Sequence, residues 1–434
     1  MQHGEQNRAA ASARRRDADG TPENAFPLGF KEFVALMAAL MAMNALSIDP
    51  MLPSLPDIAH SLDIVAVTDR HWIITVYFIG LGVGSLFYGS LSDRFGRRRV
   101  LSVTILLFLI STMLCAIASS FALLLAGRAM AGFFAAASRV IAVSIVRDRF
   151  AGDQMARIMS LIFIVFIIVP ILAPTFGQAT AALFGWRGTF WSLVLVNFAT
   201  WIWMSLRLPE TLRPENRVAI RASDIAATLK TVVTHRGSMG YMLATGVIMG
   251  SMISFITSVQ PIMFDIFDAK AIFPIAFAGM AGSLGLGSFF NSRLVERLGA
   301  RRLSQGALIC FILCAGVHSL VAWLGYESLV SFLLLQSVTM LFFAFSGSNF
   351  GSISMEPFAR GAGLASSFQA FLTSLLSSLL GAFVASHYNG TTLPLALGFF
   401  CFGSVALLLV AWAEGWTLFT RPSRGNLREP QSVR

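Results

Sequence analysis

The chain has 434 residues, of which 56% are hydrophobic and only 12% are charged, and its mean hydropathy is +0.72. That composition excludes an ordinary soluble domain, in which roughly half of the residues are apolar and about a quarter are charged. The formal net charge of +10 is compatible with a nucleic-acid-binding protein, but the positions of the basic residues, given below, argue against one.

Residues 1–28 are polar and rich in Arg and Ala, and they contain no apolar core followed by a small-residue cleavage site. They predict a disordered cytoplasmic tail rather than a cleaved signal peptide. Residues 421–434 are assigned to a second cytoplasmic tail.

Apolar stretches of the length that a bilayer requires recur from Phe30 to Trp416. A hydrocarbon core of ~30 Å needs ~20 helical residues, and continuous apolar runs without period-two alternation exclude a transmembrane barrel. The sequence therefore predicts an all-α polytopic membrane protein with twelve transmembrane helices. The predicted spans are residues 30–49, 71–92, 99–119, 121–147, 156–182, 187–207, 238–264, 271–294, 303–324, 328–352, 361–387 and 393–416.

The first predicted span ends at Asp49, which precedes Pro50. Asp49 is the only carboxylate within or bordering the first-half spans on the outer side, apart from loop residues. A carboxylate in a partly dry cavity can take up and release a proton near neutral pH, which makes Asp49 a proton-coupling candidate. The alternative is that Asp49 simply ends the helix at the interface.

The loop after the second span runs from Gly89 to Arg99. Gly89 has no side chain, so the helix can approach a neighbour closely there. Asp93 lies at the inner membrane edge, where an arginine or a helix N-terminus would stabilise its carboxylate. A gating role for this loop competes with a simpler one, in which the loop only anchors the orientation of the chain.

The fourth span carries two arginines, Arg128 and Arg139. A charge inside the membrane is costly unless it is paired or hydrated. Eleven residues make almost three helical turns, so the two side chains share one face within ~20°, and this face is expected to border an aqueous cavity. Arg139 either attracts an anionic or zwitterionic substrate, or it snorkels inward or is paired within the bundle.

The fifth span is predicted to bend, because Pro170 and Pro174 each remove a backbone hydrogen bond and Gly177 adds local freedom. The bend either bears on the direction of transport or is only a feature of helix packing.

Amide side chains in other spans are candidates for the substrate cavity, although buried amides often just join helices. These amides are Asn44, Gln260, Asn349 and Gln369.

Residues 213–236 are polar and basic and divide the apolar sequence evenly, which predicts a cytoplasmic linker between two six-helix bundles at residues 29–212 and 237–420. The two halves echo each other at an offset of 203 residues, since Leu81-Gly82-Val83-Gly84-Ser85 returns as Leu284-Gly285-Leu286-Gly287-Ser288. Two pseudo-symmetric bundles are typical of secondary transporters, whose substrate site lies between the halves near mid-membrane.

The basic residues sort by side of the membrane, as the positive-inside rule requires. This distribution places both termini in the cytoplasm and removes the need for a nucleic-acid partner. The opposite loops receive only Arg70, Arg187 and Lys270. Besides the C-terminal arginines, the residues assigned to the cytoplasmic side are Arg14, Arg15, Arg16, Arg94, Arg97, Arg98, Arg99, Arg147, Arg149, Arg157, Arg213, Arg217, Arg221, Lys230, Arg236, Arg293, Arg297, Arg301, Arg302 and Arg360.

The loop from Gly89 to Arg99 resembles the signature loop between helices 2 and 3 of the major facilitator superfamily. Other segments resemble the drug:proton antiporters of the bicyclomycin and chloramphenicol resistance group, and together they cover nearly all of the first half. The fifth span departs from the antiporter pattern at Ala173 and Gln178, where glycines are usual. The segments are Leu52 to Pro56, Arg128 to Gly132, Val146 to Asp148, Ala173 to Gly177 and Leu208 to Leu212.

This resemblance implies that Asp93 contacts Arg147 and the end of helix 11, locking the halves on the cytoplasmic side, and that Arg128 takes part in proton coupling. Arg97 to Arg99 would serve mainly topology and lipid contact. We also expect Asp49 and Arg128 to form a coupled pair, because their backbone depths differ by only ~10 Å, which long side chains and helix tilt could bridge. The implied gating residues are Gly89, Asp93, Arg94, Gly96, Arg147, Pro174 and Gly177.

The leading hypothesis is a secondary active transporter of the bacterial inner membrane that exports drugs or similar amphipathic small molecules by proton antiport with alternating access. Proton-coupled uptake by symport is the alternative, because it shares the fold and the carboxylate chemistry. An enzyme is not predicted, since the six histidines are dispersed and no catalytic or metal constellation emerges. No cofactor or ATP-binding loop is predicted; the expected partners are a small-molecule substrate, protons and membrane lipid, with the protein a monomer.

Overall fold

The computed structural model describes residues 27–150, 152–212, 215, 217, 229–358 and 362–419, and within these ranges every regular element is a helix. Most of the predicted linker and nearly all of the two predicted tails lie outside the described residues. In chain order the elements are α2 (Phe30–Leu46), η2 (Asp49–Ser54), α3 (Leu55–Ser61), η3 (Val67–His71), α4 (Trp72–Phe95), α5 (Arg97–Ala116), α6 (Phe121–Arg149), α7 (Gly152–Arg207), α9 (Arg236–Pro261), η5 (Ile262–Ile266), η6 (Lys270–Ile272), α10 (Phe273–Leu298), α11 (Ala300–Trp323), α12 (Leu329–Met355), α13 (Ala362–Ser386) and α14 (Leu393–Ala413).

Eleven helical stretches within the described residues are long and apolar enough to cross a membrane. The predicted fifth and sixth spans both fall in α7, which extends over 56 residues. A continuous helix of that length would measure ~84 Å, far more than a hydrocarbon core of ~30 Å. It is interrupted at Gly185, whose φ of 69° is not helical. The two parts of α7 therefore supply two spans, and the twelve-helix all-α prediction is confirmed.

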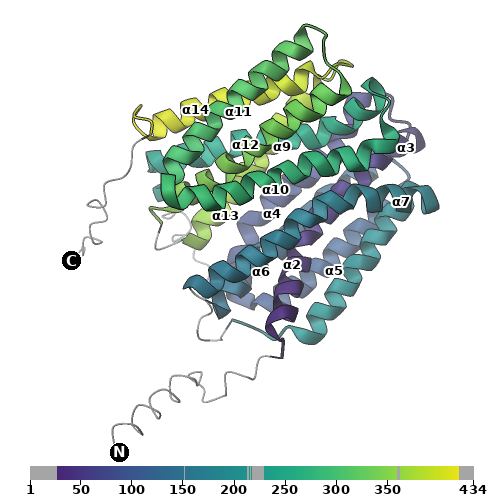
Figure 1. Ribbon diagram of the computed structural model, residues 1–434. Coiled ribbons are helices and arrows are strands. Elements are labelled where there is room, and N and C mark those ends of the chain that lie inside the picture. Colours follow the sequence, from purple (N-terminus) through teal and green to yellow (C-terminus); the bar gives the residue numbers. More distant parts are fainter. Residues whose placement is uncertain are drawn as a thin grey trace, which may run out of the picture.

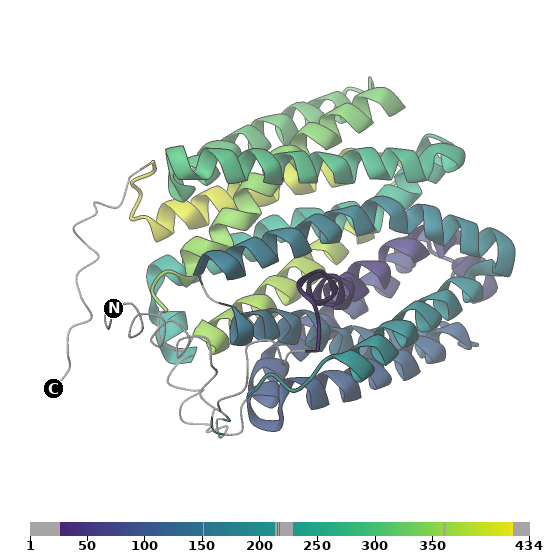
Figure 2. The same ribbon diagram turned by 60° about the horizontal axis from the view of Figure 1, so that its bottom comes forward.

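The helices form two groups, which confirms the predicted pair of six-helix bundles (Figures 1 and 2). Helices α2 to α7, coloured purple to teal, make up one group, and α9 to α14, coloured green to yellow, make up the other. The first helix of each group is the most enclosed, since 83% of the apolar window is buried in both α2 and α9. A helix that is apolar and buried all round belongs in the interior of its bundle.

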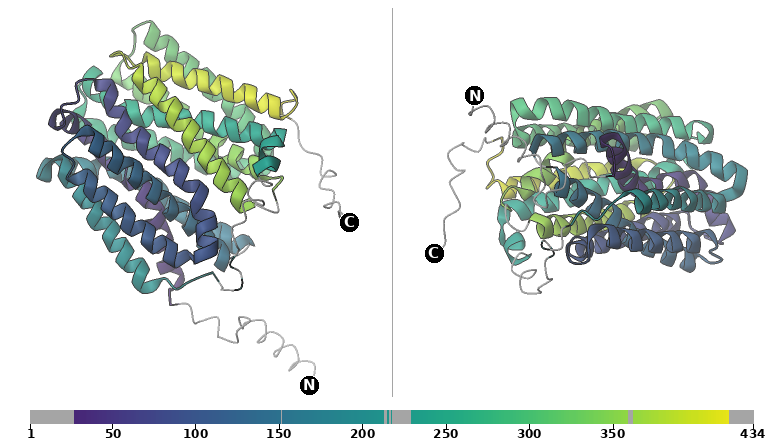
Figure 3. Two further views of the ribbon diagram at one scale, coloured as in Figure 1. Left: turned by 180° about the vertical axis from the view of Figure 1, so that it is seen from behind. Right: turned by 90° about the horizontal axis from the view of Figure 1, so that it is seen from below.

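The two halves pack against each other through α4 with α13 and through α7 with α10 (Figure 3). The close helix approach expected at Gly89 is found in the first of these contacts, because a methyl group on Gly89 would lie 3.0 Å from the Ser367 Oγ. We call the end of the bundle at which α2 begins the inner end, since the arginine distribution predicts that it faces the cytoplasm.

Candidate functional site

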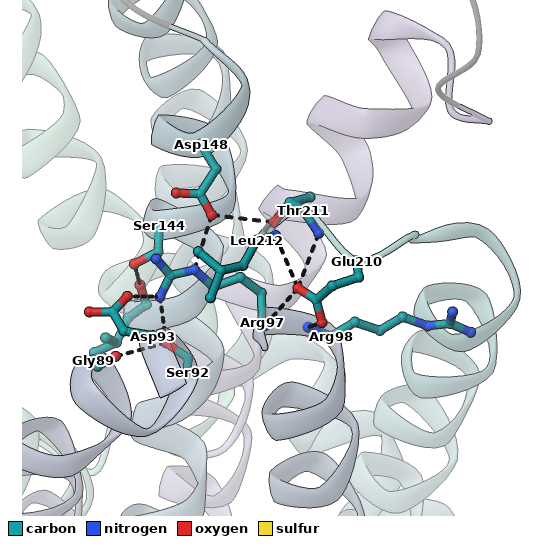
Figure 4. A network of polar contacts seen from close by, with 11 residues as sticks. Gly89, Ser92, Asp93, Arg97, Arg98, Ser144, Asp148, Glu210, Thr211 and Leu212 are labelled. Atoms are coloured by element: carbon teal, nitrogen blue, oxygen red, sulfur yellow. Dashed lines mark hydrogen bonds and ion pairs between the residues drawn. The ribbon is translucent and has the colours of Figure 1, made fainter. Parts of the chain in front are cut away.

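A buried arginine organises the inner end of the first half (Figure 4). Gly96, with a φ of 97°, turns the chain from α4 into α5 and places Arg97 at the start of α5. The Arg97 side chain is only 3% exposed; its Nη1 lies 2.5 Å from Asp93 Oδ1 and donates to Ser92 Oγ at 2.7 Å. Its Nε donates to Asp148 Oδ2 at 3.0 Å. One guanidinium thus joins the inner ends of α4, α5 and α6.

The carboxylate of Glu210, just after α7, closes the same site. It accepts hydrogen bonds from the backbone N–H of Arg97 at 2.8 Å and of Arg98 at 3.2 Å (Figure 4). The first N–H groups of a helix have no partner within the helix and carry partial positive charge, which a carboxylate stabilises. A methyl group on Gly96 would lie 2.5 Å from Glu210 Oε2, so this position needs glycine for its positive φ and for the approach of the carboxylate.

The structure differs from the prediction about the partner of Asp93. The resemblance implied Arg147, but Asp93 pairs with Arg97, and Arg147 is exposed with no ion pair to any described residue. The reason is that the turn at Gly96 brings Arg97, four residues after Asp93, back to the end of α4, while the end of α6 contributes Asp148 instead of Arg147. Arg94 is also exposed and stacks over the ring of Phe95 at 5.2 Å. The expected lipid contact of Arg97 is therefore wrong, because its side chain is buried between two carboxylates, while its part in the topology stays a prediction.

A corresponding network lies at the inner end of the second half. Arg301, near the start of α11, donates from Nε to Glu414 Oε1 at 2.8 Å and from Nη2 to Glu356 Oε2 at 2.7 Å. Glu356 follows α12 and Glu414 follows α14, so they take the places that Asp148 and Glu210 take in the first half. Each half is thus tied at its inner end by one arginine and by carboxylates from two later helices.

Arg128, in α6, is 2% exposed and bridges three elements of the first half. Its Nη1 donates to the carbonyl oxygen of Ser47 at 2.9 Å, and its Nε donates to that of Ile73 at 3.1 Å. The guanidinium also lies over the ring of Tyr77, 4.4 Å from the centroid. The carbonyl dipoles and the aromatic face stabilise the cation in the interior, and they tie α6 to the end of α2 and the start of α4.

Asp49 begins η2, the short 3-10 helix after α2, and it is 5% exposed. Its carboxylate makes no hydrogen bond or ion pair with the part of the chain that the structure describes. The expected ion pair between Asp49 and Arg128 is therefore not formed: backbone carbonyls bind the Nε and Nη1 of Arg128, and its Nη2 has no partner among the described residues. The two residues are still close along the backbone, since Arg128 holds the carbonyl of Ser47, two residues before Asp49.

The predicted bent helix packs directly on this segment. Pro174 and Gly177 are both buried in α7. A methyl group on Gly177 would lie 1.8 Å from the carbonyl oxygen of Pro50, so the backbone of α7 touches the backbone of η2. The antiporter-like segment of α7 therefore forms part of the wall that encloses Asp49.

Two of the predicted cavity amides join helices within a half. Asn44 donates to Ser138 Oγ at 3.3 Å and accepts from the Tyr77 hydroxyl at 3.3 Å, which connects α2, α4 and α6. Asn349 donates to Asn291 Oδ1 at 2.7 Å, which connects α12 to α10. These contacts match the alternative reading of a buried amide as a link between helices.

The other two amides lie at different levels of the second half. Gln260 is fully buried in α9 and lines a cavity of about 10 Å³ at the outer end, together with Arg70, His71 and Tyr388. The residues lining this cavity come from both halves. Gln369 is half-buried on α13, beside α12.

Arg139 is exposed, although it lies on nearly the same face of α6 as the buried Arg128. The structure therefore separates the two arginines that the sequence placed together: Arg128 is buried against two backbone carbonyls and the ring of Tyr77, and Arg139 is exposed.

Sequence reasoning missed the roles of Asp148, Glu210, Glu356 and Glu414. Each of these carboxylates stands within a few residues of the inner end of an apolar span. That position, opposite an arginine-rich loop on the same side of the membrane, was the available signal, because ionised groups at the membrane edge are stabilised by opposite charges.

Comparisons with known proteins agree with this architecture. The model of the Major Facilitator Superfamily matches residues 34–382. The uncharacterized MFS-type transporter YdgK of Bacillus subtilis is 29% identical over 82% of this chain and 89% of that protein. A bicyclomycin resistance protein homolog of Haemophilus influenzae is 26% identical over 84% of this chain and 91% of that protein. The multidrug resistance protein MdtL of Escherichia coli is 28% identical over 54% of this chain and 59% of that protein.

Solved structures show the same fold at lower sequence identity. The peptide transporter POT has a TM-score of 0.69 at 14% identity and covers 90% of this chain and 95% of its own. The human organic anion transporter MFSD10 has a TM-score of 0.63 at 19% identity and covers 88% of this chain and 97% of its own. These likenesses concern the fold alone.

The contact between α7 and η2 predicts that Gly177→Ala destabilises the protein. The added methyl group would lie 1.8 Å from the Pro50 carbonyl oxygen, and overpacking of this kind costs about 1–3 kcal/mol. We expect a lower thermal unfolding temperature in detergent and a loss of transport. Gly282→Ala is the matched control, because nothing lies within 4 Å of a methyl group there. Equal unfolding temperatures for the two variants would contradict the contact.

The inner-end network predicts that Asp93→Asn impairs transport while leaving membrane insertion intact. The substitution removes the charge from one of the two carboxylates that bind Arg97, and hydrogen bonds between charged groups are roughly twice as strong as neutral ones. Glu296→Gln is the control, since Glu296 takes the equivalent place in the second repeat but is exposed. Transport by Asp93→Asn at the level of the parent, with expression matched, would remove Asp93 from the mechanism.

Proposed function

Because this chain belongs to the major facilitator superfamily and is a multi-pass membrane transport protein, we propose that it exports drugs or similar amphipathic small molecules in exchange for protons by alternating access. The observation that carries the proposal is Asp49, an almost fully buried carboxylate without a partner among the described residues.

Asp49 has the surroundings that a proton carrier needs. A buried carboxylate with no hydrogen bond is far more costly as an anion than as a neutral acid, so it favours the protonated form while it is enclosed. If the wall made by α7 withdraws, water reaches the carboxylate and it can release the proton. The direct backbone contact between Gly177 and Pro50 supports this coupling between helix position and proton occupancy.

Arg128 would transmit substrate binding to the same segment. Its guanidinium holds the Ser47 carbonyl of the chain entering η2 and the Ile73 carbonyl at the start of α4. A substrate that shifts either element changes the position of Asp49 relative to α7. Binding of the substrate and of the proton would then compete, as antiport requires.

Alternating access is supported by the way the halves meet. The outer cavity around Gln260 has walls from both halves and a volume of only about 10 Å³, so the outer ends are close together there. The Arg97 and Arg301 networks each join helices of one half only. Each half can therefore move as a body, which is how paired bundles expose a central site to one side and then to the other.

The substrate class and the location rest on the relatives and on the distribution of charge. Two of the relatives are named for resistance to bicyclomycin and to multiple drugs, and we extend that activity to this chain. The excess of arginine in the loops at the inner end supports a bacterial inner-membrane location with both termini in the cytoplasm.

The proposal predicts that Asp49→Asn abolishes proton-driven efflux but spares substrate binding. A compound chosen by an accumulation screen in an efflux-deficient host serves as the probe. Purified parent protein in detergent should release protons when the probe binds, and Asp49→Asn should not. Asp57→Asn is the matched control, because Asp57 is an exposed carboxylate close by in α3. Proton release by Asp49→Asn at the parent's level would place the coupling site elsewhere.

A further inference from the structure

We propose that Arg139 is the anion-binding residue of the substrate site, and that the chain therefore prefers amphipathic substrates that carry a carboxylate or a similar singly charged anionic group. This inference rests on the proposed transport function and adds to it a chemical class of substrate. Three observations about Arg139 support it: the face of α6 on which it lies, its exposure, and its lack of a partner.

Arg139 lies on the interior face of α6. It follows Arg128 by eleven residues, which is ~20° of rotation around the helix, and Arg128 is in contact with α2 and α4. The lipid-facing side of α6 is marked by Met130, which is 44% exposed and lies ~200° around the helix from Arg128. Arg139 is nevertheless exposed, and its place on the face opposite Met130 favours an opening between the helices over lipid as the space that it reaches.

Arg139 is not hydrated at the membrane surface. Ten residues of helix separate it from Arg149 at the inner end of α6, which corresponds to ~15 Å. No arginine side chain covers that depth, so snorkelling to the inner interface does not account for the exposure. The distance to the outer end of α6 is longer still.

Arg139 has no hydrogen bond or ion pair to any residue in the described ranges, whereas the chain binds the other arginine of this span. Arg128, on the same helix face, takes two backbone carbonyls and the ring of Tyr77. Asp49 lies near Arg128, which holds the carbonyl of Ser47 two residues before it, and Arg128 lies ~16 Å from Arg139 along the helix. An intramembrane cation left open in this way is a functional position by default.

The chemistry that fits such a site is a single anionic group on an otherwise apolar molecule. Arginine binds a carboxylate with two parallel hydrogen bonds, and the ion pair it forms is neutral overall. The α2 helix facing this part of α6 supplies apolar side chains and the Asn44 amide, which already donates to Ser138, the residue before Arg139. Arg139 would thus bind the anionic group of an amphipathic molecule, and the apolar side chains of α2 would contact the rest of it.

The test compares binding of two probes that differ only in charge. Purified protein in detergent is titrated with a fluorescent coumarin-3-carboxylate and with its methyl ester, and binding is followed by quenching of tryptophan fluorescence. The parent should bind the carboxylate more tightly than the ester. Arg139→Gln should weaken carboxylate binding about tenfold or more, as expected when a charged hydrogen bond is lost, and leave the ester unchanged.

Two further variants separate a specific site from a general effect of charge. Arg139→Lys keeps the cation and should retain most of the preference for the carboxylate. Arg217→Gln removes an exposed arginine outside the spans and should change neither affinity. Thermal unfolding of each variant shows whether it is folded.

The inference is overturned if the parent fails to bind the carboxylate or binds both probes equally, or if Arg139→Gln weakens both to the same extent. Its failure is distinct from failure of the proposed function. Proton-driven export of the ester without any preference for the carboxylate would refute the anion site alone. Binding of the carboxylate through Arg139 with transport that ignores the proton gradient would refute antiport alone.

Discussion

A cation buried in the membrane-spanning part of the first half sets the main constraint on the rest of the structure. Arg128 can lie there only if groups with partial negative charge surround it, and it takes the carbonyl oxygens of Ser47 and Ile73. Because these carbonyls belong to the end of α2 and the start of α4, holding the guanidinium fixes both elements against α6. Asp49 follows Ser47 by two residues and is thereby kept in an almost fully buried position. Arg128 thus positions the candidate proton site without pairing with it.

The inner ends of the two halves are held by separate networks, while the halves meet by helix packing. Arg97 and Arg301 each draw carboxylates from later helices of their own half, so each inner end behaves as a unit. Helix α7 contacts α10 of the other half and also the η2 segment next to Asp49. Helix α9 of the other half also contacts η2, so a tilt of one half against the other would change the surroundings of Asp49, and this is the route by which we propose that substrate-driven movement releases the proton.

The spans could be predicted from the sequence because apolar run length and loop polarity are local properties. The partner of Asp93 could not, since the Arg97–Asp148 bond joins residues 51 apart and the Arg97–Glu210 bond joins residues 113 apart, and such pairs depend on how helix ends meet. The expected ion pair between Asp49 and Arg128 could not be judged from the sequence for another reason. Backbone carbonyl oxygens can also bind an arginine, and every residue has one, so the sequence does not indicate which carbonyls will bind Arg128. The sequence leaves two interpretations of Arg139 open, and its exposure on the interior face favours a cation that binds a ligand over one paired within the bundle.

The direction in which protons move with substrate tests the account most directly. Proteoliposomes containing the protein and a trapped pH-sensitive dye, with the membrane potential clamped to zero, are given an inward gradient of a compound identified in an efflux screen. Antiport through Asp49 predicts that the interior becomes more alkaline as substrate enters, and that Asp49→Asn shows no such change. Acidification of the interior would contradict antiport and show that substrate and proton travel together.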